Sequence, residues 1–389
     1  MLLPGLQHLQ NKERDAMPQK KAAIVGIVSA NAGNRLQNYA LQQVLGCSLG
    51  ASYRVETLRR GYPEKNVQTS ALKTARRHLR PLKRAYKKMF CPDVLTAFKD
   101  FDKTWIDFSR LTLSVEQPQT FDSIASEYEL FVIGSDQVWN PDFDMNSELE
   151  YLPFVAPAKK LAYAASFGVS DIVERRDRTR ELLDGIPSIS MRERAGADIV
   201  RDLTGREVSV VLDPTLLLSS QEWESVSKRP ARIQGLDEPY LLKYVLGDDA
   251  QGQDIDSLAR HRDLHVVELG DPNLPVGPAE FVWLISHAAL VCADSFHASV
   301  FSIINSTPFI IFERVSKDAD MSSRFDTLCG TFACNYRRFS HASFDLERCL
   351  DDDWARYQAV LSEEKTRSIA WLDSALEGAR TKTGVSADA

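Results

Sequence analysis

Four adjacent residues that could do chemistry follow a predicted apolar strand in the segment 291–312. This strand runs into Asp294, Ser295, Phe296 and His297, and a helix starts there. Open α/β sheets bind ligands at the carboxyl ends of their strands, and a helix N-terminus favours anions. A lone histidine in such a place is more often structural than catalytic. Here its position beside Ser295 and the helix start favours an anion-binding or proton-transferring role for His297.

A second polar cluster follows the predicted buried strand at 129–133. It contains Ser135 and Asp136, with Trp139 three residues further on. Asp136 has two interpretations, a contact with substrate or the N-cap of a following helix, since Ser-Asp before a helix is common capping chemistry. Trp139 is more typical of a core or loop anchor than of a sugar platform.

Two arginines are candidates for binding an anion. Arg192 follows a short strand and precedes a helix predicted at 195–203, and Arg324 lies in the tripeptide S-S-R. A guanidinium group pairs with both oxygens of a carboxylate or phosphate. The alternative for Arg192 is a surface ion pair with the helix that begins at Glu193.

The first loop of the chain supplies the remaining candidates. A strand at 21–29 is followed by a glycine-containing turn and a helix that begins near Asn34. The turn lacks the G-x-G-x-x-G fingerprint of dinucleotide-binding proteins. Asn34 is predicted mainly as the N-cap of that helix and alternatively as a substrate contact, while Gln37 and Asn38 on its first turns could reach a cleft.

The elements that must position these residues alternate between apolar strands and helices along the chain. This alternation predicts an α/β fold with doubly wound parallel sheets. A largely polar stretch at 216–238 is interpreted as an interdomain link. The expected divisions are a polar N-terminal tail at 1–20, Rossmann-like domains at 21–222 and 236–348, and a C-terminal helix and tail at 349–389.

Composition excludes several classes of protein. The chain has 389 residues and a net charge of −7, which argues against general nucleic-acid binding. Its six cysteines form no C-x-x-C pair, so we expect no zinc site and a reducing compartment. Acidic pairs such as Asp142 with Asp144 and Asp254 with Asp256 are common by chance. We expect no bound metal and no cofactor.

The ends and apolar segments of the sequence indicate a cytoplasmic protein. Residues 1–20 are polar and contain no apolar run typical of a secretory signal. No segment reaches the roughly 18 apolar residues of a membrane span.

A basic segment at 73–90 contains eight lysines or arginines and no acidic residue. A solvated helix face is the favoured interpretation. The alternative is peripheral contact with an anionic membrane surface or with a phosphate-bearing substrate.

Seven motifs give the chain a family resemblance, and they occur in this order: G-N-R-L-Q-N-Y-A-L (33–41), V-I-G-S-D-Q-V-W-N (132–140), Y-A-A-S-F-G (163–168), S-M-R-E (190–193), D-P-T-L-L (213–217), A-D-S-F-H-A-S-V-F-S (293–302) and M-S-S-R (321–324). The ordered set resembles the polysaccharide pyruvyl transferase family over residues 20–345. The resemblance implies two Rossmann-like domains in a glycosyltransferase-B-like arrangement. It also implies transfer of a pyruvyl group from phosphoenolpyruvate to hydroxyls of a glycan or lipid-linked saccharide, with formation of a cyclic ketal.

The resemblance also assigns roles to the candidate residues. Arg192 matches the S-x-R-E position of the family and His297 matches its F-H position. We expect a catalytic set of His297, Arg192 and Asp136. We expect a substrate-binding set of Asn34, Gln37, Asn38, Ser135, Asp294, Ser295 and Arg324.

The sequence also departs from the family pattern, and this keeps alternatives open. Ser295 stands where some members have an arginine, so another cation would have to take over any role in binding phosphate. One alternative is a glycosyltransferase-B enzyme that uses a nucleotide sugar, for which Lys243 and Glu268 could serve. The other is a non-catalytic partner in glycan assembly. The acceptor sugar, the ketal stereochemistry and the oligomeric state cannot be read from the sequence.

Overall fold

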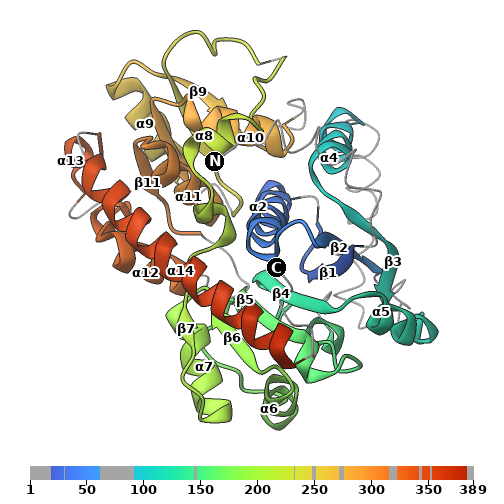
Figure 1. Cartoon of the computed structure of the whole chain (residues 1–389). Coiled ribbons are helices and arrows are strands. Elements are labelled where there is room, and N and C mark those ends of the chain that lie inside the picture. Colours follow the sequence, from blue (N-terminus) through green and yellow to red (C-terminus); the bar gives the residue numbers. More distant parts are fainter. Residues whose placement is uncertain are drawn as a thin grey trace, which may run out of the picture.

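Two parallel sheets flanked by helices make up the fold in the computed structural model (Figure 1). The structure describes residues 19–29, 31–61, 92–143, 147–231, 233–247, 251–270, 276–314, 322–340, 344–350 and 353–382. The predicted fold class, α/β with two Rossmann-like units in a glycosyltransferase-B-like arrangement, is confirmed.

The first sheet has seven strands in the order β3-β2-β1-β4-β5-β6-β7, all parallel. The interior strand β1 is apolar on both faces, as expected for a parallel sheet covered by helices on both sides, and Ala22 pairs with Val55 on one side and Leu130 on the other. The strands are β1 (Lys20–Val25), β2 (Tyr53–Gly61), β3 (Phe108–Ser114), β4 (Leu130–Asp136), β5 (Lys160–Ala165), β6 (Ser188–Met191) and β7 (Ser209–Val210).

The helices of this unit connect successive strands, as parallel pairing requires. They are α2 (Ala32–Leu49), α4 (Pro92–Trp105), α5 (Phe121–Glu127), α6 (Arg176–Asp184) and α7 (Arg194–Thr204).

The second sheet has four parallel strands in the order β11-β10-β8-β9. Its strands are β8 (Tyr240–Tyr244), β9 (His265–Glu268), β10 (Leu290–Ala293) and β11 (Phe309–Ile311). The helices after β7 are α8 (Ser220–Glu224), α9 (Gly252–His261), α10 (Pro278–Ser286), α11 (Phe296–Asn305), α12 (Ser322–Phe332), α13 (Leu346–Leu350) and α14 (Trp354–Lys382).

The connection between the sheets is more buried than its predicted polar link. Leu216, Leu217, Leu218 and Trp223 are buried there, and Pro214–Leu217 forms a short 3-10 helix, η5. The polar character predicted for 216–238 is therefore wrong at its start. The leucines and Trp223 occupy core positions that a count of polar residues does not reveal.

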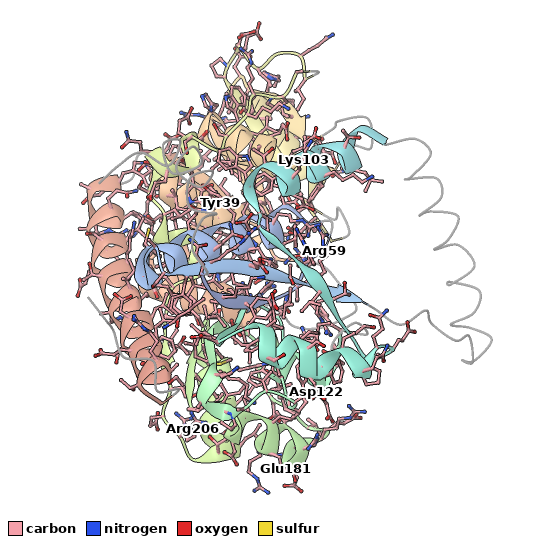
Figure 2. The ribbon with its side chains drawn as sticks, turned by 45° about the vertical axis from the view of Figure 1, so that its right-hand side comes forward. Tyr39, Arg59, Lys103, Asp122, Glu181 and Arg206 are labelled. Carbon is pink, nitrogen blue, oxygen red and sulfur yellow. The ribbon has the colours of Figure 1, made fainter. Side chains whose placement is uncertain are left out.

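Trp223 belongs to an aromatic chain that joins the two units. Its ring lies 5.6 Å from that of Tyr39 on α2 and 4.9 Å from that of Phe301 on α11. Tyr39 is labelled in Figure 2 on the blue helix α2. One hydrophobic cluster therefore contains residues of both units, and it holds the carboxyl ends of the two sheets together.

The last helix, α14, returns from the second unit to the first, where it crosses in front of β5 and β6 (red in Figure 1). Trp371 packs beside Tyr163 of β5, with ring centroids 6.1 Å apart. The backbone N–H of Leu212 donates to Ser368 Oγ at 3.0 Å. The helix α14 therefore packs against β5 and binds the backbone just after β7, where the segment that connects the two sheets begins.

Most predicted elements occur within a few residues of their expected bounds. The elements α4, β3, α5, α8, α12 and α13 were not predicted. The basic segment 73–90 lies outside the described residues. None of the described helices is long and apolar enough to cross a membrane.

Candidate functional site

The candidate site lies where strand ends of the first sheet face the N-terminus of α11. Asp136 ends β4, Arg192 follows β6 and Asp213 lies three residues beyond β7. His297 lies in the first turn of α11, and Arg324 in the first turn of α12. Side chains that are distant in sequence meet here because parallel strands direct their carboxyl ends to one edge.

Asp213 is the centre of the site, and it was missing from the predicted site residues. Its Oδ2 accepts hydrogen bonds from Arg192 Nη1, at 3.0 Å, and from Gln37 Nε2. Its Oδ1 accepts from the backbone N–H of Thr215 at 3.0 Å and from Thr215 Oγ1 at 2.7 Å. Burial alone would raise the pKa of Asp213, but His297, Arg192 and the Thr215 bonds outweigh it and hold the pKa below its usual value.

Arg192 joins two carboxylates of the first unit. Besides Asp213, its Nη2 donates to Asp136 Oδ1 at 3.2 Å, and Glu193 lies 3.6 Å from its Nε. Burial opposes the charged form of the guanidinium, yet the three carboxylates together keep the pKa of Arg192 above its usual value. The side chain is buried, so the alternative of a surface ion pair is wrong.

The structure contradicts both N-cap interpretations. No helix follows Asp136, whose φ of 66° places it in the left-handed region at the end of β4. The helix α2 begins at Ala32 and is capped by Asn31, whose side chain accepts from the N–H of Gly33 at 2.8 Å. Asn34 instead donates through Nδ2 to Asp136 Oδ2, so it belongs to the site.

His297 meets the first unit at two points. Its Nε2 lies 3.8 Å from Asp213 Oδ2 and makes no hydrogen bond in the described structure. Its ring packs against Gly33 so closely that a Cβ on this glycine would lie 2.6 Å from the ring Cγ. Burial lowers the pKa of His297, and the nearby Arg192 and Arg324 add to this, while Asp213 and Asp136 oppose it. Burial therefore favours the neutral imidazole.

Two guanidinium groups lie beside the ring of Phe296. The Cζ of Arg192 is 4.9 Å from the ring centroid and the Cζ of Arg324 is 5.8 Å from it. Such contacts stabilise a cation that has left water. Burial and the neighbouring Arg192 lower the pKa of Arg324 to about 10, so it remains charged at neutral pH. Two guanidinium groups beside a histidine can meet an anionic ligand, which at Arg192 would compete with Asp136 and Asp213.

A family model, polysaccharide pyruvyl transferase, matches residues 31–315 of the chain, which include most residues of this site. This protein belongs to the polysaccharide pyruvyl transferase family. The family is one of enzymes, so the chain is a transferase. No curated protein sequence matches it.

Solved structures with a similar arrangement of elements include three enzymes of sugar metabolism. A proposed UDP-N-acetylglucosamine 2-epimerase from Listeria monocytogenes has a TM-score of 0.48 at 12% identity, with 92% of this chain and 91% of that one covered. The UDP-GlcNAc 2-epimerase of Neisseria meningitidis has a TM-score of 0.47 at 8% identity, covering 92% and 100%. The E. coli ADP-heptose lps heptosyltransferase II has a TM-score of 0.37 at 9% identity, covering 89% and 99%. Similarities this distant say nothing about the substrate of this transferase.

The remaining predicted residues of the transferase divide into two groups. Ser135 and Gln37 join the site, since Gln37 Nε2 donates to Ser135 Oγ at 3.3 Å as well as to Asp213. Asn38 instead shapes the first loop by donating to the carbonyl oxygens of Ile27, at 3.2 Å, and Asn34, at 2.9 Å. The sequence did not distinguish these adjacent amides, because their roles depend on which side of α2 each occupies.

Asp294 binds a backbone loop of the second unit, and among the described residues it makes no hydrogen bond or ion pair with Arg192. The carboxylate of Asp294 accepts from the backbone N–H groups of Leu246 and Gly247, both at 2.8 Å, and from Arg314 Nε at 3.1 Å. Ser295 is the N-cap residue of α11, but its side chain makes no capping hydrogen bond. Asp294 therefore fixes the backbone after β8 and the side chain of Arg314, and Ser295 lies at the N-terminus of α11.

The residues named for the nucleotide-sugar alternative pair with each other. Lys243 Nζ lies 3.8 Å from Glu268 Oε1 across neighbouring strands of the second sheet. In the part of the chain that the structure describes, no group of three or more His, Cys, Asp or Glu side chains is placed to hold a metal ion.

Proposed function

We propose that this transferase moves the pyruvyl group of phosphoenolpyruvate onto two hydroxyls of a glycan sugar, forming a cyclic ketal and releasing orthophosphate. The observation that carries the proposal is the pair of buried guanidinium groups of Arg192 and Arg324 beside His297. Phosphoenolpyruvate carries a carboxylate and a phosphate, and each is a good partner for an arginine fork. Membership of the family supports the same reaction.

In the proposed reaction His297 is the general acid. Burial lowers the pKa of the imidazole, and the two anionic groups of a bound donor would raise it again, so that the ring becomes protonated. It gives this proton to the methylene carbon of the donor, and an oxocarbenium-like centre develops at the adjacent carbon. A helix N-terminus beside this acid favours the donor's negative charge.

Two sugar hydroxyls then complete the ketal. The first hydroxyl oxygen bonds to the oxocarbenium carbon and loses its proton to the carboxylate of Asp136, which passes it to the departing phosphate oxygen as the bond from that carbon to this oxygen breaks. The second hydroxyl oxygen then bonds to the carbon, and its proton restores the imidazolium of His297. The carbon gains one proton, the hydroxyls lose two and the phosphate takes up one, so the reaction balances. Asn34 and Arg192 position Asp136 for this role.

The serine at position 295, where some family members have an arginine, is compatible with this proposal. This chain places Arg324 beside the same Phe296 ring. We propose that Arg324 supplies the cation that Ser295 does not.

The test is incubation with phosphoenolpyruvate and a panel of lipid-linked and aryl glycosides. We expect phosphate release that depends on both the donor and one acceptor, with a ketal detected on that acceptor by mass spectrometry. Binding of a nucleotide sugar without binding of phosphoenolpyruvate would favour a glycosyltransferase instead. Unchanged biological function after His297→Ala would favour a non-catalytic partner.

The acceptor leads to a second proposal, which concerns the basic segment at 73–90. It connects β2 to α4 and lies outside the described residues, so it rests on sequence alone. We propose that it holds the enzyme at the cytoplasmic face of an anionic membrane, where a lipid-linked acceptor is presented. Each basic residue near such a surface contributes up to about 1 kcal/mol.

Vesicle binding tests this second proposal. The protein should bind anionic vesicles at low salt and leave them at high salt, because salt screens the attraction over roughly 8 to 10 Å. Changing Arg76, Arg77, Arg80, Lys83, Arg84 and Lys87 to serine should abolish the binding and spare turnover of a soluble acceptor. A wild-type protein that ignores anionic vesicles at low salt would leave the segment as a solvated face.

A further inference from the structure

A pocket reaches the buried arginines from the side of α12 and α14. The cavity itself has a volume of about 30 Å³, which rises to about 370 Å³ when the open solvent at its mouth is counted. Its inner end contains Arg192, Asp213, Phe296 and Arg324, all of which are buried. Its outer end contains Arg367, whose side chain is 53% exposed. The pocket therefore connects solvent to the cationic end of the proposed donor site.

One face of α12 forms a wall of this pocket. Arg324, Thr327, Leu328, Thr331 and Phe332 all line it, and they recur at the spacing of successive helical turns. The opposite wall is aliphatic and consists of Val210, Val211, Leu212 and Leu216. A narrow pocket lined by both aliphatic and charged side chains can admit a small anion but not a chain of sugar residues.

The charges along the pocket are ordered by depth. Arg367 lies at the mouth, and Arg324 and Arg192 lie at the inner end. Arg367 pairs with Glu364 one helical turn away, with Nε 3.1 Å from the carboxylate. An exposed ion pair of this kind is weak, so an incoming anion can compete with Glu364 for the guanidinium. Charged clefts with low-dielectric walls concentrate ions of the opposite sign.

We infer that this pocket is the port through which the small anionic donor enters and orthophosphate leaves, with Arg367 as its outer guide, while the glycan acceptor reaches the site by another path. This inference rests on the proposed function and adds a route and a residue to it. Arg367 is a positioning residue, because it lies at the mouth and touches none of the reacting atoms.

The test compares two charge reversals of matched ion pairs. Arg367→Glu removes the guide, and Arg180→Glu changes an arginine that is 51% exposed and pairs with Asp177 at the same i,i+3 spacing on α6, outside this pocket. Binding of phosphoenolpyruvate and of inorganic phosphate is measured by calorimetric titration without acceptor, and KM is measured for donor and acceptor separately.

Arg367→Glu should weaken binding of both anions and raise the KM for the donor about tenfold at low salt, with the difference shrinking at high salt. The KM for the acceptor and the behaviour of Arg180→Glu should match wild type. If Arg367→Glu and Arg180→Glu have equal effects, or if Arg367→Glu raises the KM for the acceptor as much as that for the donor, the pocket is not the entry route of the donor. The proposed function would stand in either case. A wild-type enzyme that binds neither phosphoenolpyruvate nor phosphate would overturn both.

A steric variant gives an independent check. Thr331→Trp should fill the pocket and slow association of both anions, measured by stopped flow, whereas Thr331→Ser should not. The melting temperature shows whether the tryptophan variant is folded. A folded Thr331→Trp enzyme with wild-type association rates would contradict the inference.

Discussion

The two walls of the site are built differently. On the first-unit wall, Asp136 and Asp213 are held by hydrogen bonds from Arg192, Asn34 and Gln37. On the second-unit wall, His297 Nε2 makes no hydrogen bond among the described residues, and it lies 3.8 Å from Asp213 across the interface. The difference indicates that hydrogen bonds fix the side chains of the first wall, whereas this nitrogen of His297 is held by packing alone.

His297→Gln should have the largest effect on activity. If the histidine is the general acid, kcat should fall by about 10² to 10⁴ with little change in the donor KM, because glutamine offers a hydrogen bond but no proton near neutral pH. Initial-rate measurements of phosphate release check this. A kcat within a factor of a few of wild type would mean that the reactive group belongs to the other wall.

Asp213→Asn should mainly lower stability. The substitution removes a charged acceptor from buried Arg192, and breaking a buried ion pair costs about 3 to 5 kcal/mol. Denaturant unfolding measures the free energy of unfolding. Asp294→Asn is the matched control on the other unit, since Asp294 is also buried and paired with an arginine, Arg314.

The two aspartate variants should differ in their affinity for phosphoenolpyruvate. Asp213→Asn should also alter the affinity for phosphoenolpyruvate, because Asp213 holds Arg192, whereas Asp294→Asn should leave it unchanged. Equal effects of both variants on donor affinity would remove the distinction drawn between the two positions.

Gly33→Ala tests the contact between the walls. A Cβ at this position overlaps the ring of His297, so the imidazole or the loop has to move. Misplacing a reacting group by about 1 Å can cost as much as 10²-fold in rate. We expect a lower kcat and a moderate loss of stability, because the added Cβ overpacks against a buried ring, although Gly33 has no left-handed φ that alanine would strain. Gly46→Ala on the same helix, where a Cβ meets nothing within 4 Å, is the control.

The smallest expected effect is the dependence of stability on pH. Burial lowers the pKa of His297 below the value of about 6.5 that it has in the unfolded chain. As the pH falls below about 6.5, the unfolded state takes up this proton first, so stability decreases until the pH reaches the folded pKa. His297→Gln should remove that part of the decrease.

Asp213 contributes in a separate and more acidic range. Its pKa is lowered in the folded protein, so its contribution is complete above the unfolded pKa of about 3.9 and is lost as the pH falls through the folded value. Denaturant midpoints measured from pH 7.5 to 3 for wild type, His297→Gln and Asp213→Asn resolve the two ranges. A His297→Gln profile parallel to that of wild type between pH 6.5 and 5 would contradict the assignment.

The sequence by itself determined the alternation of strands and helices and the positions of polar residues at strand ends. Buried parallel strands such as β1 are recognisable because both of their faces are apolar, and a polar residue just beyond such a strand stands out. Arg192, Asp136 and His297 were found in this way. Asp213 follows β7 in the same manner and was within reach of the same argument, but the short strand and the proline after Asp213 made it resemble a turn.

Only the tertiary structure decided which polar residues meet. The sequence places Asp294 three residues before His297, yet Asp294 anchors a backbone loop and Arg314, while Asp213, 84 positions earlier, faces the imidazole. The amides of Gln37 and Asn38 separate for the same reason, since a rotation of about 100° per residue turns them to different neighbours. Contacts between units depend on how two sheets pack through Tyr39, Trp223 and Phe301, and no local pattern in the chain records that packing.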